Sequence, residues 1–221
     1  MVGVPVTGNL YSFGEELAHV ITHGLGLVLA IAGLAILVAR ATLYGDAWHV
    51  TAVSIFGTTL VLMYAASTLY HSIPLPRAKH VLRVIDHSLI FFLIAGTYTP
   101  FTLVTLRGPW GWSLFGFTWG LAIVGVIFKI FATGRYEKVS LAIYLGMGWC
   151  AVAAIEPLLE NMESGGLALM LAGGLTYSGG VAFYLWQRLR YHHAIWHLFV
   201  LAGSVLHYFA ILYYVVPGPP A

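Results

Sequence analysis

Apolar residues run through this chain in seven long stretches that are separated by short polar breaks. A run of about 20 apolar residues is long enough for a helix to cross a bilayer. The stretches lie at residues 17–39, 47–71, 84–105, 111–131, 138–157, 167–187 and 192–216. The breaks between them are too short to form a soluble domain. The pattern predicts an all-α fold, a seven-transmembrane helical bundle in which residues 1–221 form a single domain.

Composition agrees with a membrane protein. The 221 residues are 60% apolar and 8% charged, and the mean hydropathy is +0.87. A typical soluble domain carries about 25% charged residues, so this chain could not cover a soluble surface of its size. The single cysteine, Cys150, excludes an intrachain disulfide and a cysteine-rich metal site. The first residues lack the features of a cleavable signal peptide, so we expect the first apolar stretch to be retained as an anchor.

The basic residues are divided unevenly between the two sides of the predicted bundle. With seven spans, the breaks after the second, fourth and sixth spans share a side with the N-terminus. Eight of the ten Lys and Arg residues lie on that side: Arg77, Lys79, Arg83, Lys129, Arg135, Lys138, Arg188 and Arg190. Only Arg40 and Arg107 lie on the other side. The positive-inside rule therefore predicts a cytoplasmic N-terminus and an outside C-terminus. We expect a multi-pass protein of the cell inner (plasma) membrane.

Two histidines open the last apolar stretch. His193 and His197 are four residues apart, which places both imidazoles on one face of a helix with Cβ atoms roughly 6 Å apart. That separation suits one divalent metal ion, and zinc is the usual occupant of imidazole clusters. Ionisable groups inside a membrane span are costly and mark functional sites. We interpret the pair as two ligands of a metal site whose other ligands must face them.

The predicted topology brings further polar residues to the same membrane depth. They are Ser67 and His71 at the end of the second span, Asp86, His87 and Ser88 at the start of the third, and Glu15, Glu16, His19 and His23 in the first. Four spans thus deliver ionisable or polar groups to the cytoplasmic side, whereas the outer half is nearly free of ionisable ones. Packing alone does not account for that distribution.

These residues suggest a catalytic zinc site. His71, His193 and His197 would fill three corners of a tetrahedron around Zn²⁺ and leave the fourth to water, as catalytic zinc sites do. Asp86 would hydrogen-bond that water as a base or orient it. Ser67 lies one helical turn before His71, where it could support a ligand or contact substrate.

Each residue also has an ordinary structural role to be weighed against this one. A membrane histidine taken singly more often bonds a backbone carbonyl. Asp86 near a helix start could favour the positive end of the helix dipole, and Ser67 could bond the carbonyl one turn earlier. Their joint placement favours the metal site.

The order and spacing of these residues resemble a known family. Ser67-x3-His71, Asp86-x-Ser88 and His193-x3-His197 are similar to motifs of the hemolysin III branch of the progestin and adipoQ receptor superfamily. The segments EELAHVITHGLG (15–26) and DHSLIFFLIAGTYTP (86–100) are close to signatures of that branch.

The resemblance implies a seven-helix bundle with zinc near the cytoplasmic face, held by His71, His193 and His197. It also places Asp86 near a zinc-bound water and Ser67 close to the metal. We expect Ser88, His23, His19 and His207 to support the ligands or line the cavity. His207 matches a recurrent family histidine that lies deeper in the membrane, and His19 stands where the family motif has Asn.

Two functions compete. The first is a zinc-dependent, ceramidase-like hydrolase that acts on a membrane lipid amide or ester, with a lipid or fatty acid as its partner. The second is a non-enzymatic regulator of membrane state, a lipid-sensing receptor or a cytolytic protein, in which zinc is structural. A pore would need polar residues along a whole path, and the outer half lacks them. A retinal pump would need a lysine in the last span, and 192–216 contain none. We expect no nucleic-acid partner.

Overall fold

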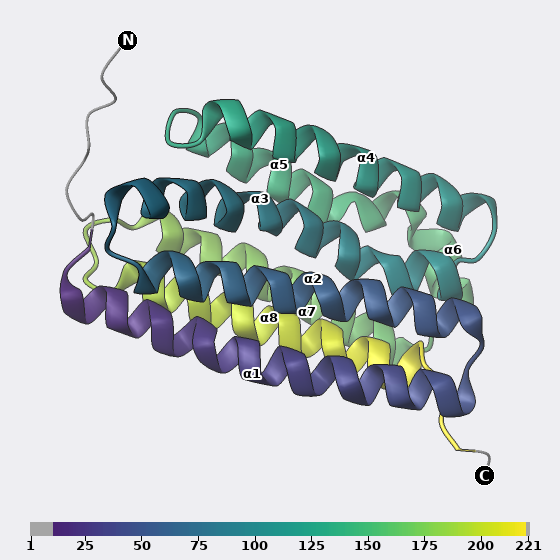
Figure 1. Cartoon of the computed structure of the whole chain (residues 1–221). Helices are drawn as coiled ribbons and strands as arrows, with labels where there is room; N and C mark the ends of the chain where they lie inside the picture. Colours follow the sequence, from purple (N-terminus) through teal and green to yellow (C-terminus); the bar gives the residue numbers. More distant parts are fainter. Residues whose placement is uncertain (1–10, 220–221) are drawn as a thin grey trace.

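A computed structural model describes residues 11–219 of the chain, and it is all-helical (Figure 1). Seven helices in that range are long and apolar enough to cross a membrane, which confirms the predicted fold class. Six of these spans contain the helices α1 (Phe13–Tyr44), α2 (Ala47–Ser72), α3 (Pro76–Pro100), α4 (Pro109–Ala132), α7 (Ser164–Leu185) and α8 (His192–Tyr214). The remaining span comprises α5 (Glu137–Trp149), a 3-10 segment (Cys150–Ala154) and α6 (Ile155–Asn161).

The helix starts follow from local sequence. Ser12 caps α1 in a capping box, because its hydroxyl accepts from the Glu15 backbone while the Glu15 carboxylate accepts from the Ser12 backbone. Asp46 caps α2 by accepting from the backbone N–H groups of Trp48 and His49. Helices α3 and α4 begin with proline, whose fixed φ suits the first turn of a helix.

The third span begins earlier than the apolar pattern predicts. The structure starts α3 at Pro76, whereas the predicted span starts at residue 84. The first two turns carry Arg77, Lys79 and Arg83, so hydropathy alone does not reveal them as helix. The predicted break between the spans 47–71 and 84–105 is therefore wrong over most of its length, because residues 76–83 are helical and carry these basic residues. At its other end, Pro100 precedes a π-helical segment (Phe101–Thr105), since proline removes a helical hydrogen bond.

The fifth span is interrupted within the membrane. Its 3-10 segment precedes Pro157, which lacks an N–H group and crowds the carbonyl four residues earlier. Helix α6 continues to Asn161 and α7 begins at Ser164, so the break between the predicted spans 138–157 and 167–187 is shorter than expected.

The packing of the helices determines which of them enclose the centre. Helix α1 packs chiefly against α2, α7 against α8, and α3 against α2 and α4, while α8 also contacts α1. Figure 1 shows α4 and α5 on the opposite side of the bundle from α1. The start of α1 and the end of α8 lie at opposite ends of the bundle. Outward-facing side chains such as Ile21, Leu43 and Phe131 are exposed and apolar, as expected for surfaces that face lipid.

Candidate metal centre

Three of the predicted residues converge at one end of the bundle. His71 lies in the last turn of α2, and His193 and His197 lie one turn apart at the start of α8. All three are buried, and one ligand atom from each lies within 4.8 Å of the others. The structure thus brings together the three histidines of the predicted site as a group that could hold a metal ion.

Hydrogen bonds orient two of the three rings. His71 Nδ1 donates to the Glu16 carboxylate on α1 at 2.6 Å. His197 Nδ1 lies 3.2 Å from the hydroxyl of Thr22, which already donates to backbone carbonyls and so accepts from the ring. In both residues the Nε2 lone pair is left free. His71 Nε2 is buried without a hydrogen-bond partner among the described residues, which is the state of a nitrogen available as a ligand.

His19 is a fourth imidazole in the same group. Its ring centroid lies 4.4 Å from that of His71, 4.9 Å from that of His193 and 5.2 Å from that of His197. Its Nε2 is also buried and unpaired within residues 11–219. Glu16, His19 and His71 form a second set whose ligand atoms lie within 4.8 Å of one another. We call His19, His71, His193 and His197 the histidine cluster.

His23, Ser67 and Asp86 form the next layer. The Ser67 hydroxyl lies 2.7 Å from His23 Nδ1, so it pairs with another helix and not with a carbonyl of its own. The His23 ring stacks on His197 with centroids 3.5 Å apart. Asp86 is buried and lies beside Ser67. It lines a cavity that His193 and His197 also line. Its carboxylate is outside the group of mutually close ligand atoms formed by the three histidines.

The structure separates Ser88 and His207 from this group. Ser88 is buried, but it does not line the cavity, and its hydroxyl has no partner in the described part of the chain. His207 lies ten residues beyond His197 on α8, and its Nδ1 bonds the Gly203 carbonyl at 2.9 Å.

The sequence placed Glu16 at this depth but did not predict its contact with His71, and it did not indicate Thr22 or Tyr11 as contacts of the cluster. Glu16 and Thr22 orient the rings, and Tyr11 packs its ring edge-on against His19 with centroids 4.7 Å apart. Burial raises the pKa of the Tyr11 phenol above its usual value, so the ring over the cluster stays neutral. The spacing of Glu16 and His19, three residues apart, was the one available signal, because it places both on one helix face.

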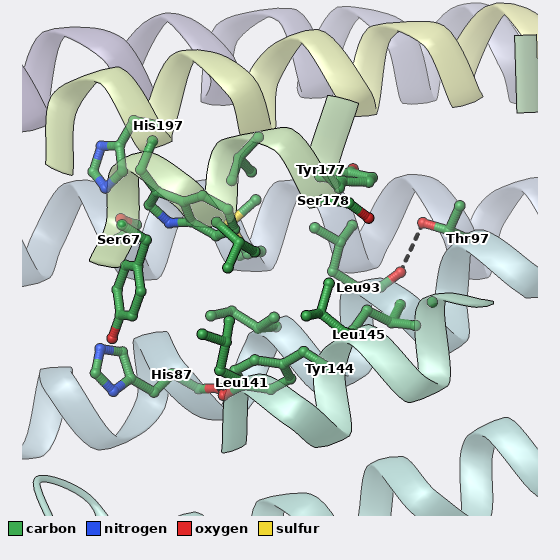
Figure 2. Close-up of a pocket in the computed structure, with 18 of the residues that line it drawn as sticks. Ser67, His87, Leu93, Thr97, Leu141, Tyr144, Leu145, Tyr177, Ser178 and His197 are labelled. Carbon is green, nitrogen blue, oxygen red and sulfur yellow. Dashed lines mark hydrogen bonds between the residues drawn. The ribbon is translucent and has the colours of Figure 1, made fainter. Parts of the chain in front are cut away.

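A cavity leads away from the cluster. Its volume is about 150 Å³, roughly ten times the ~10–15 Å³ that one water requires. It reaches from His193 and His197 past Asp86 to Tyr177 and His207, and its lining is mostly apolar. Figure 2 shows His197, Ser67 and His87 at one end and Tyr177, Ser178 and Thr97 at the other.

A second ionic group lies beside the cavity. Lys129 is only 1% exposed and donates to the Glu137 carboxylate at 2.7 Å. Arg83 and the backbone N–H of Gly134 also donate to Glu137, at 3.5 and 2.8 Å, and His87 Nδ1 lies 3.8 Å away. We call Arg83, His87, Lys129 and Glu137 the Glu137 cluster. Lys129 lies in the last turn of α4.

Comparison with known proteins identifies the family. The family described as "Haemolysin-III related" matches residues 11–208. The chain is 50% identical over 203 residues to "Hemolysin-3" of Bacillus cereus, covering 92% of this chain and 93% of that protein. It is 44% identical over 210 residues to "Hemolysin-3 homolog" of Bacillus subtilis (strain 168), covering 95% and 99%. It is 32% identical over 211 residues to the human "Monocyte to macrophage differentiation factor", covering 93% and 86%. The chain belongs to the hemolysin III family, as the resemblance predicted.

Proposed function

We propose that this protein is a zinc-dependent hydrolase of a membrane lipid amide or ester. The observation that carries the proposal is a group of three buried, mutually close imidazoles, His71, His193 and His197. Two of them, His193 and His197, line one end of a mostly apolar cavity. Such a cavity suits an acyl chain, and the histidines would lie beside the polar group to which the chain is attached. With the predicted topology, this reaction would occur near the cytoplasmic face of the inner membrane.

The donor set supports zinc as the metal. Neutral imidazole nitrogens are preferred zinc ligands, and three of them leave a coordination position open. A buried nitrogen without a partner, such as His71 Nε2, destabilises the fold unless something binds it. Bound there, zinc would polarise a carbonyl group and make a neighbouring water more acidic.

The surrounding residues then have distinct roles. Asp86 lines the cavity and would accept the proton of the attacking water. Ser67 lies between Asp86 and His23, so it would hold the Asp86 carboxylate in position. Glu16 would fix the orientation of His71 through its hydrogen bond to Nδ1.

Metal analysis tests the site. We expect the purified wild type to contain zinc, and His71→Ala, His193→Ala and His197→Ala to lose it. His80→Ala is the matched control, because His80 is an exposed histidine on the first turns of α3. Retention of metal at wild-type stoichiometry by the three variants would show that the site is wrong.

A separate assay tests the reaction. Wild type and Asp86→Asn are incubated with ceramides and phospholipids, and released fatty acid is measured by mass spectrometry. We expect release by the wild type and its loss in Asp86→Asn, with zinc content unchanged. No release from any lipid by zinc-loaded wild type would reject the hydrolase.

One observation favours the alternative, a non-enzymatic membrane protein with a structural metal. His19 packs against all three predicted ligands, and a fourth imidazole would close the site to water. Cobalt substitution separates the two functions. A coordinated water gives a cobalt spectrum that changes with pH, whereas four imidazoles give one that does not. Under the alternative, His19→Asn would introduce the pH dependence that the wild type lacks.

A further inference from the structure

The deep end of the cavity contains a hydrogen-bond acceptor without a partner among the residues that the structure describes. His207 is 8% exposed and lines the cavity. Its Nδ1 lies 2.9 Å from the Gly203 carbonyl, and because a carbonyl only accepts, Nδ1 carries the proton. Nε2 is then an acceptor, and it has no hydrogen-bond partner among residues 11–219.

The other polar groups at this end are already paired. Thr97 donates to the Leu93 carbonyl, as the dashed line in Figure 2 shows, and Ser178 donates to the Gly174 carbonyl while accepting from Trp149. Tyr177 lies 2.8 Å from Ser204, with which it shares a hydrogen bond. His207 is therefore distinguished from its neighbours by its free nitrogen.

The packing of α7 against α8 holds the ring in place. A Cβ atom at Gly173 would lie 2.3 Å from the His207 ring, and one at Gly203 would lie 2.9 Å from the Tyr177 ring. Each glycine thus makes room for an aromatic ring of the facing helix, and the rings of Tyr177 and His207 stack with centroids 5.5 Å apart. The arrangement fixes the direction of Nε2.

We propose that His207 is a subsite for a hydroxyl group near the middle of a lipid acyl chain. The proposal rests on the lipid ligand of the proposed function. Ten residues of helix place His207 about 15 Å beyond His197, and both residues line one cavity. A lipid whose polar group lies at the histidine cluster would therefore extend its chain past His207. A chain hydroxyl there would donate to Nε2, and both groups would avoid being buried unpaired.

Binding measurements on the full-length protein in detergent test this subsite. The probes are stearic acid, stearic acid hydroxylated in mid-chain, and stearic acid hydroxylated at its methyl end. We expect the mid-chain hydroxyl to tighten binding about two- to tenfold, the range of one net hydrogen bond. The hydroxyl at the methyl end should add no such gain, because it would lie beyond His207.

Two variants locate the effect. His207→Phe keeps an aromatic ring but removes the acceptor, so it should bind plain and mid-chain hydroxylated stearic acid equally. Thr97→Val is the matched control, since its hydroxyl lies in the same cavity but already donates to Leu93, and it should keep the preference.

The wild type alone can overturn the inference, even if a variant fails to fold. Equal binding of plain and mid-chain hydroxylated stearic acid would reject the subsite and leave a lipid ligand standing. Absence of binding by every probe would reject the lipid ligand as well. A preference that survives in His207→Phe would assign the hydroxyl to another residue.

Discussion

The histidine cluster and the Glu137 cluster both place ionisable groups in the buried part of a membrane protein, but they differ in whether those groups have partners within the protein. In the Glu137 cluster the charges are paired within the protein, since Lys129, Arg83 and a backbone N–H all donate to one carboxylate. In the histidine cluster, Nε2 of His19 and of His71 and Nδ1 of His193 are buried without partners in the described part of the chain.

The difference indicates which group needs something from outside. Burying a polar atom is costly unless it is hydrogen-bonded. The charged groups of the Glu137 cluster meet that requirement by linking α3, α4 and α5, which is a structural role, and only His87 Nδ1 is left buried without a hydrogen-bond partner in the described part of this cluster. The histidine cluster leaves it unmet, and a bound metal ion would supply the missing partner.

The largest effect is expected from breaking the paired group. Glu137→Gln leaves the Lys129 ammonium buried without its carboxylate, so we expect a loss of about 3–5 kcal/mol in the free energy of unfolding. Thermal unfolding in detergent measures it, and zinc content per folded protein should not change. A variant that keeps wild-type stability would show that the ion pair contributes nothing to the fold.

Metal removal should produce the next largest effect. Free metal at 100 times its dissociation constant stabilises the folded state by about 2.7 kcal/mol, so chelation should lower the unfolding temperature of the wild type. His71→Ala should not respond to the chelator, whereas Glu137→Gln should respond as the wild type does. An equal response of His71→Ala and the wild type would contradict a metal bound at this site.

A smaller effect should follow when a ring loses its orientation. Glu16→Gln weakens the hydrogen bond to His71 Nδ1, and changes of this kind reduce metal affinity about 10–100-fold. Competition with a chelator measures the affinity. Glu15→Gln is the control, since Glu15 caps α1 and contacts Ser12 and the Tyr191 backbone instead. Identical affinities for the two variants would remove Glu16 from the site.

The smallest effect is expected at Ser88. Its buried hydroxyl has no partner among the described residues and lies off the cavity, so Ser88→Ala should leave zinc affinity unchanged. Stability should stay the same or rise by about 1 kcal/mol or less. A loss of zinc affinity would instead support the role predicted from sequence, in which Ser88 supports the ligands.

Much of the fold could be predicted because membrane spans have a strong local signal. Each span must be apolar over about 20 residues, and all seven were found. The errors lie where that signal fails, at the basic first turns of α3 and around Pro157. Both segments are helical in the structure. Hydropathy does not reveal them, because the first carries three basic residues and the second carries a proline between charged residues.

The site was predicted in part for a similar reason. His193 and His197 are related by helix periodicity, so their spacing alone places them together. His71 required the topology, and the structure brings it to the other two. Thr22 was missed, and Glu16 was predicted only as an ionisable group at this depth, because the role of a Glu or Thr depends on the ring that it contacts in the fold.

The sequence by itself determined the membrane class, the seven spans and the His193–His197 pair, because each depends on periodicity or spacing within a short segment. It also indicated the family, through the order of motifs along the chain. Only the tertiary structure decided which nitrogens are left free, that His19 joins the group, and that Lys129 is paired with Glu137. These properties depend on distances between helices far apart in the sequence, and hydrogen bonding is decided by tenths of an ångström. The same holds for His207, whose free Nε2 is known only once the contacts of both ring nitrogens are seen.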